Sequence, residues 1–160
     1  MAPFSRPLTP GEIAGLPPGL VAAVDMSAVR LVRAHHPLSR LSKALRGYAV
    51  ILVRGRQIFW PNLPDDMSGD RAAMTLLGHE LVHVWQYATG MNVARYVWRD
   101  VIRNLGRYAY RIKPGKAYTN YAYEQQAAML EDWMRLEAGL SIRWGQGVDK
   151  AALKALLPFL

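Results

Sequence analysis

One short motif constrains this chain more than any other feature: residues 79–83 have the pattern HExxH. From Asp70 to Tyr87, apolar residues recur every three or four positions, as they do along one face of an α-helix. On such a helix His79 and His83 lie four residues apart and project from the same face, so both can bind one metal ion. The motif therefore predicts an amphipathic helix that carries a metal site.

The residue types around the motif favour zinc. The chain contains no cysteine, so a bound metal must be held by His, Asp or Glu, a set more typical of catalytic than of purely structural zinc sites. Zinc lowers the pKa of a bound water toward about 7, and Glu80, one position beyond His79, can accept a proton from that water. We predict Zn²⁺ as the cofactor and Glu80 as the general base. The alternative is a helix whose two histidines are solvated or satisfied within the core.

A catalytic zinc ion needs a third protein ligand, which the motif does not supply. A further histidine six residues beyond His83 is absent, because position 89 is Thr. We predict Glu124, which opens a later helical stretch and lies far enough along the chain for an intervening helix to run out and another to return. Glu131, on nearly the same face, could instead be the ligand or a carboxylate that orients a histidine. Glu124 would then be only a favourable first-turn acid. The other candidates are Asp132 and Glu137.

Tyrosines cluster just before Glu124, at Tyr118, Tyr121 and Tyr123. A phenol at this place could donate a hydrogen bond to the oxyanion that forms when water attacks a carbonyl. Tyr121 and Tyr123 are our catalytic candidates, and aromatic packing around a helix start is the alternative for each. His35 and His36 could also be ligands, although adjacent histidines in a loop are more often solvated.

Short strand-like and helical patterns fill the rest of the chain. Strands are expected over 28–33, 48–53 and 57–60, the last two forming a hairpin around Gly55. The first helix is expected to begin at the capping box formed by Thr9 and Glu12. Further helices are expected from Ser68 or Asp70 to Gly90, over 92–111, from Thr119 or Asn120 to Gly139, and after Asp149. This order predicts an α+β domain that is mainly helical, with a small antiparallel or mixed sheet.

Length and composition indicate how many domains the chain has and where the protein is located. A chain of 160 residues fits one domain, so we expect residues 1–160 to form a single unit. No apolar run reaches the roughly 18–20 residues that a membrane-spanning helix needs. The first ten residues contain prolines and no apolar stretch, so we expect no Sec signal. The protein is expected to be soluble and either cytoplasmic or exported by another route, such as a contractile injection system.

The basic residues suggest an anionic partner. The formal net charge is +8, and arginines recur every four positions along the helix expected over 92–111. This stripe consists of Arg95, Arg99, Arg103, Arg107 and Arg111. It would suit docking to an acidic protein, a membrane surface or a cell-wall polymer, and nucleic acid is not the expected partner. The alternative is a solvated face whose arginines lie along core aromatics.

Beyond the five-residue motif, residues 79–86 have the pattern HELxHxxQ, which resembles the bacterial zincin-like metallopeptidase domains of gluzincin type. The chain is most similar to the small bacterial "Vgr-related" proteins of that group. The segments that carry this resemblance are 6–12, 25–33, 55–60, 79–86 and 123–127. Related domains often occur in toxins or cargo of contractile injection systems.

The resemblance implies a minimal gluzincin-like core, in which a small sheet lies beside the HExxH helix and a later helix supplies a glutamate. His79, His83 and Glu124 then correspond to the zinc ligands and Glu80 to the general base. One position departs from the pattern: many gluzincins carry an acid four residues after the ligand glutamate, and this chain has Ala128 there.

The expected function is zinc-dependent hydrolysis of a peptide or related amide, with an extended peptide aligned along the hairpin of residues 48–60. The alternative is a non-catalytic, zinc-containing binding module, an injection-system cargo or adaptor that docks an anionic partner through the arginine-rich helix. A weaker alternative is a basic membrane or nucleic-acid binder in which the metal only stabilises the fold. The presence of Glu80 favours catalysis.

Overall fold

The structure of the protein is a computed structural model that describes residues 4–35, 51–105 and 107–160. Within these ranges it contains six α-helices and one four-stranded mixed sheet, which confirms the predicted α+β class. None of the described helices combines the length and the apolar character needed to cross a membrane. That residues 1–160 form one domain stays a prediction.

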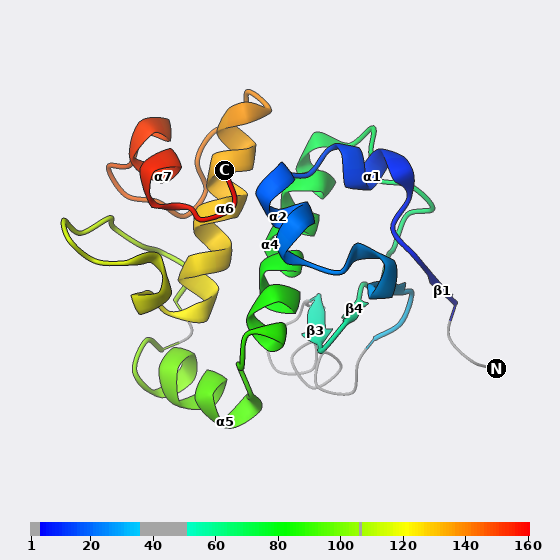
Figure 1. Cartoon of the computed structure of the whole chain (residues 1–160), viewed down its shortest axis with the longest axis horizontal. Coiled ribbons are helices and arrows are strands. Elements are labelled where there is room, and N and C mark those ends of the chain that lie inside the picture. The colour runs from blue at the N-terminus through cyan, green and yellow to red at the C-terminus, as the bar shows by residue number, and fades with distance from the viewer. Residues whose placement is uncertain (1–3, 36–50, 106) are drawn as a thin grey trace.

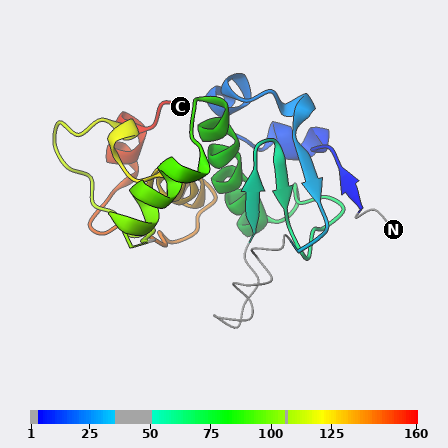
Figure 2. The ribbon, with the colours of Figure 1, turned by 90° about the horizontal axis from the view of Figure 1, so that it is seen from below.

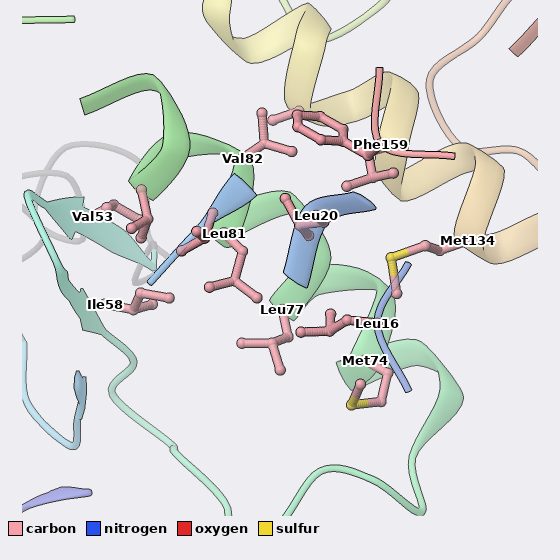
Figure 3. Packing of buried hydrophobic residues seen from close by; sticks show 14 of the residues in the cluster. Leu16, Leu20, Val53, Ile58, Met74, Leu77, Leu81, Val82, Met134 and Phe159 are labelled. Carbon is pink, nitrogen blue, oxygen red and sulfur yellow. The ribbon is translucent and has the colours of Figure 1, made fainter. Parts of the chain in front are cut away.

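The HExxH helix lies at the centre of the molecule. This helix, α4 (Arg71–Ala88), packs against α6 (Tyr123–Glu137) on one side and against α2 (Pro18–Ala23) and the sheet on the other (Figure 1). Leu77 and Leu81 of α4 are fully buried among the apolar side chains that fill this second interface (Figure 3). Because neighbours cover α4 on both sides, its histidines are held in a buried environment.

A glycine sets the spacing between α4 and α6. Gly78, one residue before the motif, faces Met134 of α6, and a Cβ atom at this position would collide with the Met134 sulfur. The absent side chain therefore lets the two helices approach closely. The close approach brings His79, the next residue of α4, onto the surface of α6.

The four strands are β1 (Ser5–Arg6), β2 (Arg30–Val32), β3 (Leu52–Arg54) and β4 (Gln57–Phe59). Their order is β1-β2-β4-β3, and β2 runs parallel to β4 while the other pairs are antiparallel. The predicted hairpin forms around Gly55, whose φ of +62° suits glycine. Residues 48–50 of its first strand lie outside the described residues. The sequence analysis did not predict β1.

The predicted capping box starts α1 (Pro10–Ala14). The Thr9 hydroxyl accepts from the Glu12 amide at 3.1 Å, and the Glu12 carboxylate accepts from the Thr9 amide at 2.9 Å. Glu12 is fully buried and also accepts from the Arg6 guanidinium and the Met67 amide. Burial raises the pKa of this carboxyl, but these donors outweigh burial and leave the pKa below its ordinary value. The cap therefore joins α1 to the strand before it and to the loop before α4.

Aspartates cap two other predicted helices. Of the two candidates for α4, Asp70 accepts from a first-turn amide at 3.0 Å. Asp149 caps α7 (Lys150–Leu156) in the same way at 2.8 Å. These two helix starts could therefore be read from local sequence.

The helix predicted over 92–111 is wrong in its second half. A short helix, α5 (Val93–Tyr96), continues directly into a π-helix, η2 (Val97–Ile102), and a turn follows in which Leu105 has a φ of +53°. Arg107 and Arg111 lie beyond this turn, so the five arginines do not form one helical stripe.

The helix ends early because the residues after it form hydrogen bonds with other segments of the chain. The Tyr110 amide donates to the Trp144 carbonyl at 3.4 Å, and the Gln146 amide donates to the Tyr110 carbonyl at 3.0 Å. The Asn104 side chain donates to the Arg107 carbonyl at 2.8 Å, a local bond that competes with helix continuation. Tertiary pairing therefore overrides the helical pattern beyond the turn.

Helix α6 begins a few residues later than predicted. Thr119 and Asn120, the expected caps, belong to a short 3-10 helix, η3 (Tyr118–Asn120). The first amides of α6 are capped across space, because the Asp100 carboxylate accepts from the Tyr123 amide at 3.1 Å and from the Glu124 amide at 2.9 Å. A residue of η2 therefore holds the turn that carries Glu124.

Candidate metal centre

The structure brings the three predicted ligands together. His79 and His83 of α4 and Glu124 of α6 are all buried, and one ligand atom from each lies within 4.8 Å of the others. The Nε2 atoms of His79 and His83 are 3.5 and 3.3 Å from Glu124 Oε2. Among the described residues this is the group that could hold a metal ion. His35 is not part of it, and His36 lies outside the described residues.

The unsatisfied atom in this group fits a metal ion. Glu124 Oε2 is buried and has no hydrogen-bond partner, although buried carboxylate oxygens are normally paired. The other oxygen, Oε1, accepts from the Tyr96 hydroxyl at 2.7 Å. One oxygen is therefore held by the protein while the other faces two imidazole nitrogens, an arrangement that a cation between them would satisfy.

The outer nitrogens of both imidazoles are anchored. His79 Nδ1 lies 3.0 Å from Glu131 Oε2, and His83 Nδ1 lies 2.8 Å from Gln86 Oε1. The Gln86 amide nitrogen donates to the carbonyl of Tyr123, which sets the orientation of the amide. Since both partners accept, each Nδ1 must carry a proton, and each Nε2 can present its lone pair to an ion.

Glu131 therefore orients a histidine, and the other carboxylates of α6 face elsewhere. Asp132 accepts from the Tyr110 hydroxyl at 3.0 Å and from the Gly145 amide at 2.8 Å. Glu137 pairs with Lys150 at the surface. Of the four acids that the sequence analysis considered on this helix, only Glu124 reaches both inner nitrogens.

The electrostatics of the metal-free site also call for a positive charge. Burial lowers the pKa of His79, but Glu124 and Glu131 outweigh it and raise this pKa to about 10. Burial raises the pKa of Glu124, but the charges of His83 and His79 bring it well below its ordinary value. The buried carboxylates therefore favour a positive charge between them, which a bound metal ion would supply.

Glu80 is the predicted general base, and this role stays a prediction. It follows His79 on α4, and its side chain is almost completely buried. Burial raises the pKa of Glu80, whereas the charges of His79 and His83 lower it in part. The carboxyl group therefore interacts with both histidines of the site without being one of the three clustered ligand candidates.

The two tyrosines predicted for catalysis contact other groups. The Tyr121 hydroxyl accepts from the Lys113 amide at 2.8 Å, and the Tyr123 ring lies under the Arg99 guanidinium, 4.8 Å from its centroid. Their catalytic role stays a prediction. Tyr96 is the phenol that contacts a candidate ligand, and the Tyr108 ring lies 5.8 Å from the His79 ring.

The sequence analysis missed Tyr96 and Tyr108. Neither belongs to the motif or to the tyrosine cluster, and the segment between them was expected to be one helix. The available signal was the four-residue spacing of Tyr96 and Asp100, which predicts that both lie on one face of a helix. In the structure both contact the first turn of α6.

Comparison with known proteins relates the chain to a secretion-system protein. No family model matches the chain. A segment of 58 residues is 41% identical to the type VI secretion system spike protein VgrG2b of Pseudomonas aeruginosa, covering 34% of this chain and 6% of that protein. The whole structure is similar to the effector domain of P. aeruginosa VgrG2b, with a TM-score of 0.68 and 26% identity over 94% of this chain and 80% of that domain. The chain resembles the VgrG2b effector domain. Since the matched segment covers only 6% of full VgrG2b, the likeness concerns this one domain.

Proposed function

We propose that this VgrG2b-like domain is a zinc-dependent hydrolase that cleaves a peptide or a related amide. The observation that carries the proposal is the buried group of His79, His83 and Glu124, in which both imidazoles are anchored through Nδ1 and Glu124 Oε2 has no hydrogen-bond partner. Two histidines and one carboxylate are a common protein ligand set for catalytic zinc.

The roles of the surrounding residues follow from their contacts. Zinc held by the three residues would polarise a substrate carbonyl and lower the pKa of water toward about 7. Glu80, adjacent to His79, accepts the proton of the attacking water and returns it to the leaving amine. Glu131 and Gln86 orient the imidazoles, and the Tyr96 hydroxyl holds Glu124.

The sheet offers a place for an extended substrate. Among the described strands, β3 is at the end of the order β1-β2-β4-β3, and it contacts α4. An edge strand has unpaired backbone groups that can pair with an added peptide strand. A peptide bound along β3 would lie next to the helix that carries His79, His83 and Glu80.

Two substitutions test this function. Purified protein loaded with zinc should contain one ion per chain by elemental analysis, and Glu124→Ala should lose most of it. Glu80→Gln should keep the zinc but lower the rate of peptide cleavage by about 10²–10⁴-fold, the usual contribution of a general base. The substrate is a broad peptide library that includes cell-wall amides. Wild-type protein that binds no stoichiometric zinc in metal-replete buffer would show that the proposal is wrong.

A second candidate is a non-catalytic, zinc-containing binding module. It is favoured by the exposed apolar side chains on the outer face of α5 and η2 and by the arginines among them. Zinc binding by wild-type protein without cleavage of any library member would support it. The Glu80→Gln variant would then behave like wild type in both measurements. In either case we propose delivery by an injection system, because VgrG2b is a type VI spike protein.

A further inference from the structure

The helical element formed by α5 and η2, residues 93–102, has an inner and an outer face. It lies at the edge of the molecule beyond the carboxyl end of α4 (Figures 1 and 2). Tyr96 and Asp100 form its inner face, since Tyr96 bonds to Glu124 and Asp100 is fully buried at the start of α6. Trp98 and Ile102 are each two residues further along, so they point to the opposite side.

The outer face is apolar. Trp98 is 59% exposed, Ile102 is 56% exposed, and Leu105 in the following turn is 71% exposed. We call these three residues the apolar ridge. Seven large hydrophobic side chains are exposed in the described part of the chain, and five of them fall between Val93 and Leu105. Such a concentration of apolar surface on one small element marks an interaction site.

Four positive charges belong to this element and to the loop that follows it. Arg99 and Arg103 follow Trp98 and Ile102 in the sequence, and Lys113 and Lys116 come from the loop beyond. We call these four residues the basic patch. Three of them meet at Tyr121: its carbonyl accepts from Arg99, its hydroxyl accepts from the Lys113 amide, and the Lys116 ammonium lies 4.1 Å from its ring centroid. Burial lowers the pKa of Lys116, and the charges of Lys113, Arg99 and Arg103 lower it further.

The sequence between Asp100 and Glu124 contains no acidic residue. The same stretch contains five Lys or Arg. The ion pairs found within the described ranges all involve other residues. Arg107, Arg111, Lys113 and Lys116 also line a cavity of about 380 Å³ whose wall includes Tyr121. The surface therefore combines exposed apolar side chains with uncompensated positive charge.

We propose that the apolar ridge and the basic patch form a docking surface for an anionic lipid bilayer. Trp98, Ile102 and Leu105 would enter the boundary between headgroups and acyl chains, and the basic patch would bind lipid phosphates. A short helix with Trp and aliphatic side chains on one face and cations beside them is typical of interfacial binding. A nucleic acid would match the charge, and its bases could stack on Trp98, but it would leave the aliphatic side chains of Ile102 and Leu105 in water.

This surface is independent of the proposed hydrolase activity, but it would orient the protein. Tyr96, on the inner face of the same element, contacts Glu124 of the candidate metal centre. The two faces of one helix are separated by roughly 10 Å. A docked protein would therefore hold its candidate metal centre close to the bilayer.

Vesicle co-sedimentation of the full chain tests the proposal. Wild-type protein should bind vesicles that contain POPG and POPC and bind POPC vesicles weakly, and binding should fall as salt rises. A basic-patch variant, Arg103→Gln/Lys113→Gln/Lys116→Gln, should bind roughly 10- to 100-fold more weakly. An apolar-ridge variant, Trp98→Ser/Ile102→Ser, should bind roughly tenfold more weakly because less apolar area is buried.

A matched control removes three positive charges elsewhere. Arg30→Gln/Arg56→Gln/Lys154→Gln changes exposed residues of β2, of the turn between β3 and β4, and of α7, and should bind within about twofold of wild type. An equal loss in this control and in the basic-patch variant would overturn the proposal, since net charge alone would then explain binding. Equal binding to POPC vesicles, or an apolar-ridge variant that binds like wild type, would also overturn it. Circular dichroism and thermal melting confirm that each variant is folded.

Sedimentation of the free protein distinguishes a different occupant of the same surface. If wild-type chains self-associate, the apolar-ridge variant is monomeric, and neither binds POPG vesicles, the surface joins two copies of this chain and the lipid proposal is wrong. Zinc content and peptide cleavage are measured on the same variants. Because the proposed ligands and Glu80 are unchanged in them, a failure of lipid binding is distinguishable from a failure of the hydrolase proposal.

Discussion

Two helical elements contribute to the candidate metal centre in different ways. Helix α4 supplies His79 and His83 and is covered by α6 on one side and by the sheet and α2 on the other. The element formed by α5 and η2 supplies Tyr96 and buries it together with Asp100, while its outer face stays exposed. Both elements carry pairs spaced by four residues. The same spacing gives a buried site in one and a two-faced surface element in the other, because among the described residues only α4 has neighbours on both sides.

The largest expected effect breaks the packing of α4. Leu81 is fully buried, so Leu81→Ala should lower the free energy of unfolding by about 2–5 kcal/mol through lost burial and the cavity left behind. Urea denaturation followed by circular dichroism measures this change. A loss under about 1 kcal/mol would contradict the assignment of α4 as the centre of the core.

The next effect concerns the contact that anchors an imidazole of α4. Glu131→Gln replaces the carboxylate that binds His79 Nδ1, and should lower zinc affinity by about 10- to 100-fold. Competition with a chromogenic chelator measures the affinity. Glu137→Gln, on the same helix but paired with Lys150 at the surface, is the control and should leave zinc affinity unchanged.

A smaller effect is expected where the second element meets α6. Asp100→Ala removes the cap on the Tyr123 and Glu124 amides, so it should cost about 1 kcal/mol of unfolding free energy and also lower zinc affinity. Chemical denaturation and metal titration measure the two effects. Asp149→Ala, at the start of α7, should cost a similar free energy without changing zinc affinity. Equal zinc affinity in both variants would show that Asp100 does not position Glu124.

The smallest effect is expected on the outer face of the second element. Ile102 is 56% exposed, so Ile102→Ala should change the free energy of unfolding by no more than about 0.5 kcal/mol. The same denaturation experiment applies. A loss comparable to that of Leu81→Ala would mean that this face is covered, and the contrast between the two elements would disappear.

The parts of the site that could be predicted from sequence are those with local geometry. His79, Glu80 and His83 follow from a five-residue pattern on one helix, and the capping box at Thr9 and Glu12 follows from four residues. Glu124 was predicted as the third ligand from its place in a later helix, and Glu131 stayed open as an alternative ligand. Only the packing of α6 on α4 shows that Glu131 binds Nδ1 of His79 while Glu124 faces Nε2.

The helix predicted over 92–111 failed because a local spacing pattern was extended beyond the end of the actual helix. Arginines every four residues over 92–111 indicate a helix, but the chain leaves the helix after η2 and pairs Tyr110 with residues 144–146 instead. Those partners lie more than thirty positions away in the sequence, so no local pattern reports them. The consequence for function is a basic patch drawn from η2 and a loop, instead of one helical stripe.

By itself, the sequence determined the motif helix, its two histidines and the adjacent glutamate, because a helix repeats every 3.6 residues and sets which side chains share a face. The tertiary structure alone decided that Asp100 and Tyr96 hold the turn of Glu124, and that Trp98 and Ile102 stay exposed beside uncompensated positive charge. The physical reason is that the candidate metal centre combines side chains from distant segments. Burial and hydrogen bonding between those segments decide which of the candidate residues come together.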